Sequence, residues 1–142
     1  MVCSIDHLAS AAGVQMLRSG GSAADAAVAA SAVLSVTSPH VCGMGGDLLA
    51  VVVPAGGIPV ALNASGRAGS GADPERLRAE GYRVMPFRGD IRAVTVPGCV
   101  DGWLALHERF GVLPIAHVLE PARAYARDGF PRRRRWRRAS LR

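Results

Sequence analysis

The sequence contains no lysine, few aromatic residues and only three cysteines. The small numbers of aromatic residues and cysteines limit the kind of core and the kinds of metal or redox site that the chain can form. Aromatic residues make up 5% of the 142 residues, so a core has to be built largely from small aliphatic side chains. Cys3, Cys42 and Cys99 lie far apart, without a C-x-x-C pair or a Cys/His cluster. That spacing indicates neither a zinc site nor a dithiol redox site. An odd cysteine count is typical of a reducing compartment.

Long apolar runs are also missing. The longest, residues 26–36, is shorter than the roughly 18 residues that a membrane-spanning helix needs. The first seven residues contain neither the basic nor the apolar segment of a secretory signal. A chain of this length can form one domain with a core of its own. We therefore expect a soluble, cytoplasmic protein that does not enter a membrane.

The positive charge is concentrated at the C-terminus. Seven of the seventeen arginines lie in residues 131–142, and the remaining ten stand against eleven acids, a net charge of −1 rather than +6. We predict that residues 131–142 form a separate Arg-rich tail, either disordered or translated out of frame, because runs of one charge are usually disordered. The alternative is a small nucleic-acid-associated module that binds phosphates and bases through Arg132–Arg138. No basic face on residues 1–130 supports that alternative.

Residues 1–130 mix helical and strand patterns and predict an α/β (α+β) fold. Ser22 and Asp25 have the spacing of a capping box at the start of a helix. The continuous apolar run at residues 48–53 is typical of a strand covered on both faces, and Pro121 predicts a kink or a break into two helices. The predicted helices span residues 8–18, 23–35, 74–79, 100–110 and 115–125, and the predicted strands span residues 48–53, 60–63 and 93–96.

Two short segments are candidate binding sites. The glycine-rich segment Gly43–Asp47 is either an anion cradle or a tight turn, and it lacks the Lys-Ser/Thr ending of a phosphate-binding loop. Ser65-Gly66-Arg67 follows the predicted hairpin. Arg67 in that loop is either a bidentate clamp for a carboxylate or a solvated loop arginine. No G-x-S-x-G elbow surrounds Ser65, so a hydrolase serine is not indicated.

No catalytic set, metal site or cofactor site is evident from the residues alone. The four histidines lack metal-ligand spacing. His107 falls on an apolar helical face and is interpreted as a hydrogen-bonded core or boundary residue. The chain has only two threonines, Thr37 and Thr95, and the local sequence places no base beside either one.

Seven motifs follow one another along residues 1–130, and together they resemble the gamma-glutamyltransferase (gamma-glutamyltranspeptidase) family. Each motif alone is weak, but seven in the same order are specific. They are His7–Gly13, Gly20–Ala30, Cys42–Asp47, Leu62–Ala68, Thr95–Gly98, Asp101–Trp103 and Pro121–Phe130.

The resemblance implies an N-terminal-nucleophile hydrolase with a four-layer α/β/β/α sandwich, of which this chain is a partial, N-terminal fragment. The family precursor cuts itself into a large and a small subunit. The new N-terminal threonine of the small subunit then attacks the gamma-glutamyl amide of glutathione-like substrates, with its own amine as base. The chain resembles only the first part of the large subunit. We expect it to need the remaining large-subunit and small-subunit sequence, to be inactive alone and to use no cofactor.

One departure from the family concerns substrate recognition. In glutathione-cleaving members an Arg-Glu pair after the hairpin strand holds the glutamyl α-carboxylate, and by position that pair falls at Ser65 and Gly66. Arg67 lies two residues after the family's arginine. The candidate substrate-binding residues are therefore Arg67 and Ser65. This version of the loop resembles a divergent branch that can include acylase-like members acting on other amides.

Overall fold

The computed structural model describes residues 1–86 and 89–131. Residues 132–142, with most of the predicted tail and the arginines of the nucleic-acid alternative, lie outside the described residues, so the boundary at residue 130 stays a prediction. None of the described helices combines the length and the apolar character that crossing a bilayer requires. The elements in chain order are α1 (His7–Arg18), α2 (Ala23–Thr37), β1 (Leu48–Val52), β2 (Val60–Ala64), α3 (Pro74–Ala79), a 3-10 turn (Ile91–Ala93), α4 (Cys99–Phe110) and α5 (Ile115–Asp128).

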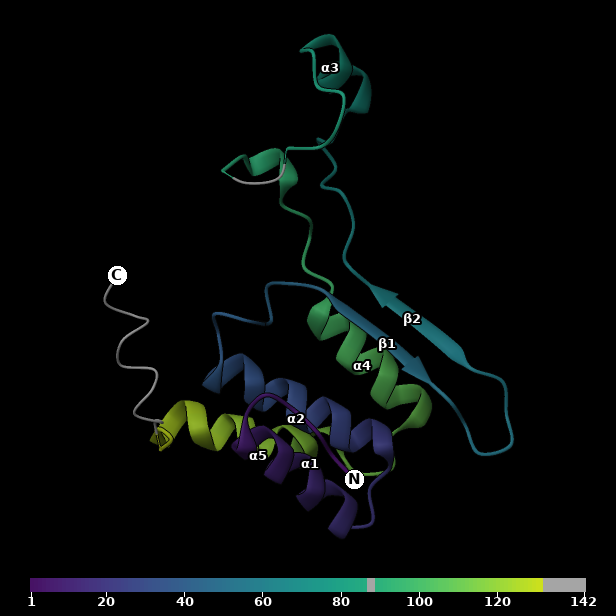
Figure 1. Ribbon diagram of the computed structural model, residues 1–142, viewed down its shortest axis with the longest axis vertical. Helices are drawn as coiled ribbons and strands as arrows, with labels where there is room; N and C mark the ends of the chain where they lie inside the picture. Colours follow the sequence, from purple (N-terminus) through teal and green to yellow (C-terminus); the bar gives the residue numbers. More distant parts are fainter. Residues whose placement is uncertain (87–88, 132–142) are drawn as a thin grey trace. The chain divides into compact units, whose positions relative to one another are not determined.

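The chain divides into two compact units. The first contains residues 1–43 and the described residues from His107 onward, and the second contains Met44–Leu106. In the first unit α1 and α5 both pack against α2 (Figure 1). Small side chains allow the helices to approach closely. The buried side chains of this unit include Ala9, Ala12, Met16, Val28, Ala29, Val33, Val118 and Ala122.

A buried carboxylate connects the start of α2 to the loop before α5. The capping box predicted from Ser22 and Asp25 is confirmed: each side chain accepts a hydrogen bond from the other residue's backbone N–H. Asp25 Oδ2 also accepts from the backbone N–H groups of Val112 (3.0 Å) and Leu113 (3.3 Å). Burial raises the pKa of Asp25, but these backbone hydrogen bonds outweigh it and leave the pKa below its ordinary value.

His107 lies beside the same carboxylate. Its Nε2 is 2.7 Å from the carbonyl oxygen of Leu113 and 3.7 Å from Asp25 Oδ1. The side chain is half-buried. The sequence-based interpretation of His107 as a hydrogen-bonded boundary histidine is therefore confirmed.

The second unit contains the antiparallel hairpin of β1 and β2. Leu48 pairs with Ala64, and Val52 pairs with Val60. Burial alternates along both strands. Leu49 and Val51 are each 72% exposed, so within the described residues the predicted cover on both faces of this strand is wrong. The β1–β2 hairpin packs one face against α4. Its other face would need a second layer of helix or sheet, which the described residues do not supply.

The hairpin lies against the first turns of α4 (Figure 1). A Cβ on Gly102 would be 2.7 Å from the Cβ of Ala64 and 3.1 Å from that of Leu48, closer than side chains normally approach. Cys99 N–H donates to the carbonyl of Gly46 at 3.0 Å. Gly102 therefore lets α4 pack directly on the hairpin. This packing positions the start of α4, to which the segment of residues 65–98 leads.

Two further expectations differ from the structure. Residues 93–96 form no strand, because Asp90 caps a 3-10 turn through its bond with Arg92 N–H, and only Val96 makes an isolated bridge. The break into two helices at Pro121 is wrong, since α5 continues through Pro121 as one helix, and the alternative of a kink stays a prediction. A proline inside a helix costs about 3 kcal/mol, which the burial of Val118 and Ala122 against α2 can offset.

Candidate functional site

Hydrogen bonds from Thr95 and Val96 hold the two ends of the Ser65-Gly66-Arg67 loop. Ser65 N–H donates to Asn63 Oδ1 at 3.1 Å, which turns the backbone just after β2. Thr95 Oγ1 donates to the Ser65 carbonyl at 3.3 Å, and Val96 N–H donates to the Arg67 carbonyl at 2.8 Å. The loop therefore has a defined backbone path.

Gly66 allows the close approach of the two segments. Its φ of +82° lies in the left-handed region that favours glycine. A Cβ at this position would stand 2.0 Å from the carbonyl oxygen of Val96. A side chain at position 66 would therefore have to displace the segment around Val96. The glutamate that the family resemblance places here has no room in this backbone.

Arg67 and Ser65 differ in what they can offer a ligand. The Arg67 side chain is exposed, and among the residues that the structure describes it makes no ion pair. Its guanidinium donors are therefore available to a carboxylate. Ser65 is half-buried, and its backbone carbonyl and N–H are already used within the loop. The structure places the two residues on one hydrogen-bonded loop, with no hydrogen bond between their side chains in the described part of the chain. Their role in substrate binding stays a prediction.

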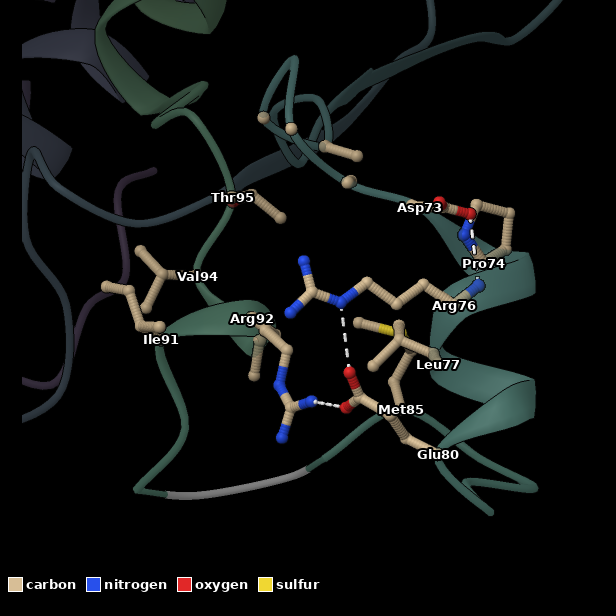
Figure 2. A pocket seen from close by; sticks show the side chains of 15 residues that line it. Asp73, Pro74, Arg76, Leu77, Glu80, Met85, Ile91, Arg92, Val94 and Thr95 are labelled. Carbon is tan, nitrogen blue, oxygen red and sulfur yellow. Dashed lines mark hydrogen bonds and ion pairs between the residues drawn. The ribbon is translucent and has the colours of Figure 1, made fainter.

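A second feature of this unit is a cavity of about 640 Å³ between residues 68–80 on one side and Met85 and residues 91–95 on the other. Figure 2 shows its lining side chains, which come from α3, the 3-10 turn and the segments beside them. Most of the wall is apolar. The charged side chains that reach it are Asp73, Arg76, Glu80 and Arg92.

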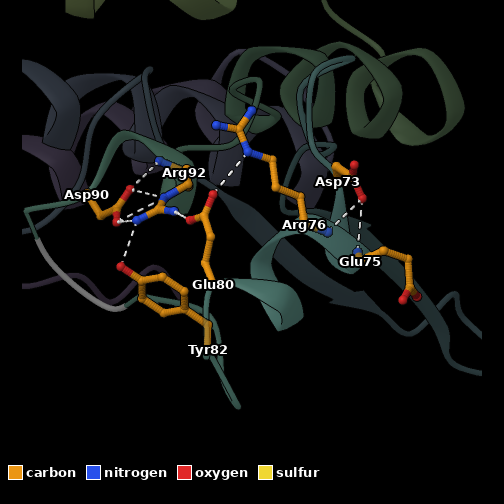
Figure 3. A network of polar contacts seen from close by, with 7 residues as sticks. All are labelled: Asp73, Glu75, Arg76, Glu80, Tyr82, Asp90 and Arg92. Atoms are coloured by element: carbon orange, nitrogen blue, oxygen red, sulfur yellow. Dashed lines mark hydrogen bonds and ion pairs between the residues drawn. The ribbon is translucent and has the colours of Figure 1, made fainter.

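Arg76, Glu80 and Arg92 of the cavity lining belong to a network of arginines and carboxylates (Figure 3). Arg92 donates to both oxygens of Asp90, to Glu80 and to the Tyr82 hydroxyl. The Arg92 guanidinium lowers the pKa of Asp90 to about 2. Hydrogen bonds from Arg76 first and Arg92 second lower the pKa of Glu80. All of these carboxylates are ionised at neutral pH.

Sequence reasoning did not identify the network or the cavity. Only the i,i+4 spacing of Arg76 and Glu80 on a helix could have indicated an ion pair locally. The Arg92–Glu80 pair joins residues twelve positions apart across an irregular segment, and no periodicity predicts such a contact. Within residues 1–86 and 89–131, no three His, Cys, Asp or Glu side chains gather as metal ligands.

The chain is similar to known proteins over most of its length. The family model for gamma-glutamyltranspeptidase matches residues 9–142. The Glutathione hydrolase-like YwrD proenzyme of Bacillus subtilis is 47% identical over 132 residues, which is 92% of this chain and 25% of that protein. The oxamate amidohydrolase proenzyme of Klebsiella pneumoniae is 45% identical over 130 residues, or 88% of this chain and 24% of that protein.

A solved structure shows the same arrangement of elements. The gamma-glutamyltranspeptidase of Helicobacter pylori matches with a TM-score of 0.81 and 32% identity, over 92% of this chain and 38% of that one. The predicted α/β fold, as a fragment of an N-terminal-nucleophile hydrolase, is confirmed. The chain spans about a quarter of the length of the two curated relatives.

Proposed function

Because the chain belongs to the gamma-glutamyltranspeptidase family, we propose that it is part of an N-terminal-nucleophile hydrolase that cleaves or transfers gamma-glutamyl or related acyl amides, glutathione among them. The observation that carries this proposal is the match of almost the whole chain to a glutathione hydrolase-like proenzyme at 47% identity. These relatives give no support to the nucleic-acid alternative.

The part of the reaction that we assign to this chain is recognition of the acyl group. Arg67 is exposed and unpaired among the described residues, on a loop that Thr95 and Val96 hold in place. A guanidinium in that position can bind a substrate carboxylate through two parallel hydrogen bonds. Ser65, on the same loop, supplies a hydroxyl two residues away. Such an anchor fixes the reacting amide without taking part in bond breaking.

We assign the attacking hydroxyl to sequence outside these 142 residues. Thr37 Oγ1 is buried and has no hydrogen-bond partner among the described residues. Thr95 Oγ1 donates to the Ser65 carbonyl. A nucleophilic hydroxyl needs a base within hydrogen-bond reach, and within the described part of the chain neither threonine has a histidine, carboxylate or free amine as a partner.

The resemblance supplies the chemistry of the complete enzyme. The hydroxyl of an N-terminal threonine adds to the amide carbonyl, its own amine accepts the proton, and that proton passes to the leaving amine as the C–N bond breaks. Water then hydrolyses the acyl ester, or an amino group accepts the acyl group. The Arg67 loop would hold the acyl group through both steps.

A chimera tests this assignment. Residues 1–130 of this chain replace the matching region of the Bacillus subtilis YwrD proenzyme, and turnover is measured with a gamma-glutamyl anilide, glutathione and oxamate. We expect the chimera to process itself and to hydrolyse at least one of these amides. A correctly processed chimera with no activity on any of them would contradict the proposal, and so would failure of the precursor to process under conditions where the parent does.

The role of Arg67 is tested in the same chimera. Loss of a charge-assisted, bidentate contact should lower kcat/KM by about 10- to 100-fold in Arg67→Gln. Arg83→Gln is the matched control, because Arg83 is also exposed and makes no ion pair among the described residues. Equal activity of the two variants would remove Arg67 from the site.

A further inference from the structure

The cavity between residues 68–80 on one side and Met85 and residues 91–95 on the other has no role in the function proposed above, yet it has the form of a ligand site. Its volume of about 640 Å³ falls within the range of small-molecule pockets. Leu77, Met85, Ile91 and Val94 supply apolar walls (Figure 2). The charged lining side chains are Arg76 of α3, Asp73 and Glu80 at the two ends of α3, and Arg92 of the 3-10 turn. All of these residues belong to the second unit.

The apolar walls are more exposed than large hydrophobic side chains usually are. Met85 is 57% exposed, Ile91 is 82% exposed and Val94 is 64% exposed. Single exposed apolar residues need no explanation, but several that converge on one cavity form a surface that a ligand can cover. An apolar ligand body would remove these side chains from water.

Among the charged side chains that the structure describes at the cavity, Arg76 has open donor groups. Arg76 uses its Nε to donate to Glu80 Oε1 at 3.0 Å, and among the described residues its two terminal nitrogens have no hydrogen-bond partner. Figure 2 shows this guanidinium reaching from α3 toward the middle of the lining residues. Arg92 also lines the cavity, but its nitrogens already donate to Asp90, Glu80 and Tyr82. Arg76 is therefore the group that can bind a ligand anion.

The charged side chains that line the cavity balance, since Arg76 and Arg92 stand against Asp73 and Glu80, and the lining therefore has no net positive charge to attract a dianion. Glu80 stands beside Arg76, and Asp73, which also lines the cavity, is a second carboxylate. Both would repel a dianion such as a phosphate ester. A carboxylate matches the planar pair of terminal nitrogens that Arg76 leaves open.

We propose that this cavity binds a small monocarboxylate with an apolar body, with the carboxylate on Arg76 and the body against Leu77, Met85 and Ile91. The site lies beside the Ser65–Arg67 loop, because Thr95 lines the cavity and also donates to the Ser65 carbonyl. Binding there does not depend on amide hydrolysis. A failure of the proposed function would therefore leave this proposal intact.

The test uses the 142-residue chain fused to a soluble carrier, with the carrier alone as blank, and hexanoate as probe. Ligand-observed NMR measures binding of hexanoate, hexanamide, acetate and inorganic phosphate. Hexanoate should bind about tenfold or more tightly than hexanamide, which lacks the charge, and than acetate, which lacks the apolar body. Phosphate should not displace it. Hexanamide binding as tightly as hexanoate, or phosphate displacing it, would overturn the proposal.

Two arginines of α3 provide matched variants. Arg76→Gln removes the open guanidinium, whereas Arg78→Gln removes an arginine that pairs with Glu75 and does not line the cavity. α3 buries no residue, so neither change removes core packing, and circular dichroism checks that both variants keep their helix content. We expect hexanoate binding to weaken about tenfold in Arg76→Gln and to stay unchanged in Arg78→Gln. Equal binding by both variants would assign the probe to another surface.

Discussion

At the scale of single residues, Asp25 connects parts of the chain that are far apart in sequence. Its carboxylate receives backbone N–H groups from Ser22, Val112 and Leu113, the last two 87 and 88 positions away. The side chain is fully buried. Removal of such an acceptor leaves buried donors without partners, which costs more than the loss of one ordinary hydrogen bond.

We therefore predict that Asp25→Ala opens the loop before α5. A local loss of about 3 kcal/mol should speed amide exchange at Val112 and Leu113 by about 100-fold. Asp6→Ala is the control, because Asp6 caps α1 with one bond to Leu8 N–H and should cost only about 1 kcal/mol. Equal effects of the two substitutions would show that the long-range bonds contribute little.

The pH dependence at this site follows from the lowered pKa of Asp25. The contribution of the carboxylate is complete above its ordinary pKa of 3.8 and is lost as the pH falls through the lowered folded-state value. Helix content followed by circular dichroism should therefore fall on acidification below about pH 4 in the unmodified chain. Asp25→Ala should have lost this component already at neutral pH. An identical acid transition in both proteins would contradict the assignment.

Gly66 carries a second prediction at the residue scale. Gly66→Ala places a methyl group against the Val96 carbonyl and forces a left-handed backbone on alanine, so the Arg67–Val96 bridge should break. Backbone strain of this kind costs about 1–3 kcal/mol. Exchange of the Val96 amide should therefore become at least about tenfold faster. Gly69→Ala is the control, since nothing lies near its added methyl group. Unchanged protection of Val96 in Gly66→Ala would show that the loop tolerates a side chain.

At the scale of elements, polar contacts hold the described residues between 73 and 95 together more than a hydrophobic core does. α3 and the 3-10 turn bury no residue, and Arg92 joins them through Glu80, Asp90 and Tyr82. Arg92 also stacks on the Tyr82 ring, 4.6 Å from its centre. A segment of this kind opens easily when its central contact is removed.

Arg92→Gln should therefore expose this segment while the helices of the first unit keep their protection. Limited proteolysis should cut within residues 73–95 several-fold faster, and amide exchange in α1 and α2 should not change. Arg83→Gln, which removes no ion pair among the described residues, should behave like the unmodified chain. If Arg92→Gln is cut no faster than Arg83→Gln, the network does not hold the segment.

Elements with local signals could be predicted from the sequence, and those that depend on distant partners could not. The helix of residues 74–79 and the capping box at Ser22 follow from nearby side chains and agree with the structure. The strand predicted at residues 93–96 failed because strand formation requires a partner, and only Val96 has one. In the candidate site, the Ser65–Arg67 loop is visible in the sequence, but the contact between Gly66 and Val96 and the Arg92 network are not.

At the scale of the whole molecule, residues 1–86 and 89–131 leave one face of the hairpin uncovered. Leu49 and Val51 are each 72% exposed, and Val53 is 67% exposed. An apolar strand with open edges promotes association between chains. We predict that the isolated chain is poorly soluble or loosely packed. The double substitution Leu49→Thr with Val51→Thr should increase the soluble fraction measured by sedimentation. A sharp cooperative melt of the unmodified monomer would contradict this prediction.

The central claim is that this chain supplies scaffold and substrate contacts to an amide-cleaving enzyme whose nucleophile lies elsewhere. The measurement that tests it most directly is the turnover of a gamma-glutamyl anilide by the purified 142-residue chain. The account predicts a rate equal to that of buffer. A saturable rate above buffer that copurifies with the chain and disappears in Thr95→Ala or Thr37→Ala would place the nucleophile within these residues and contradict the claim.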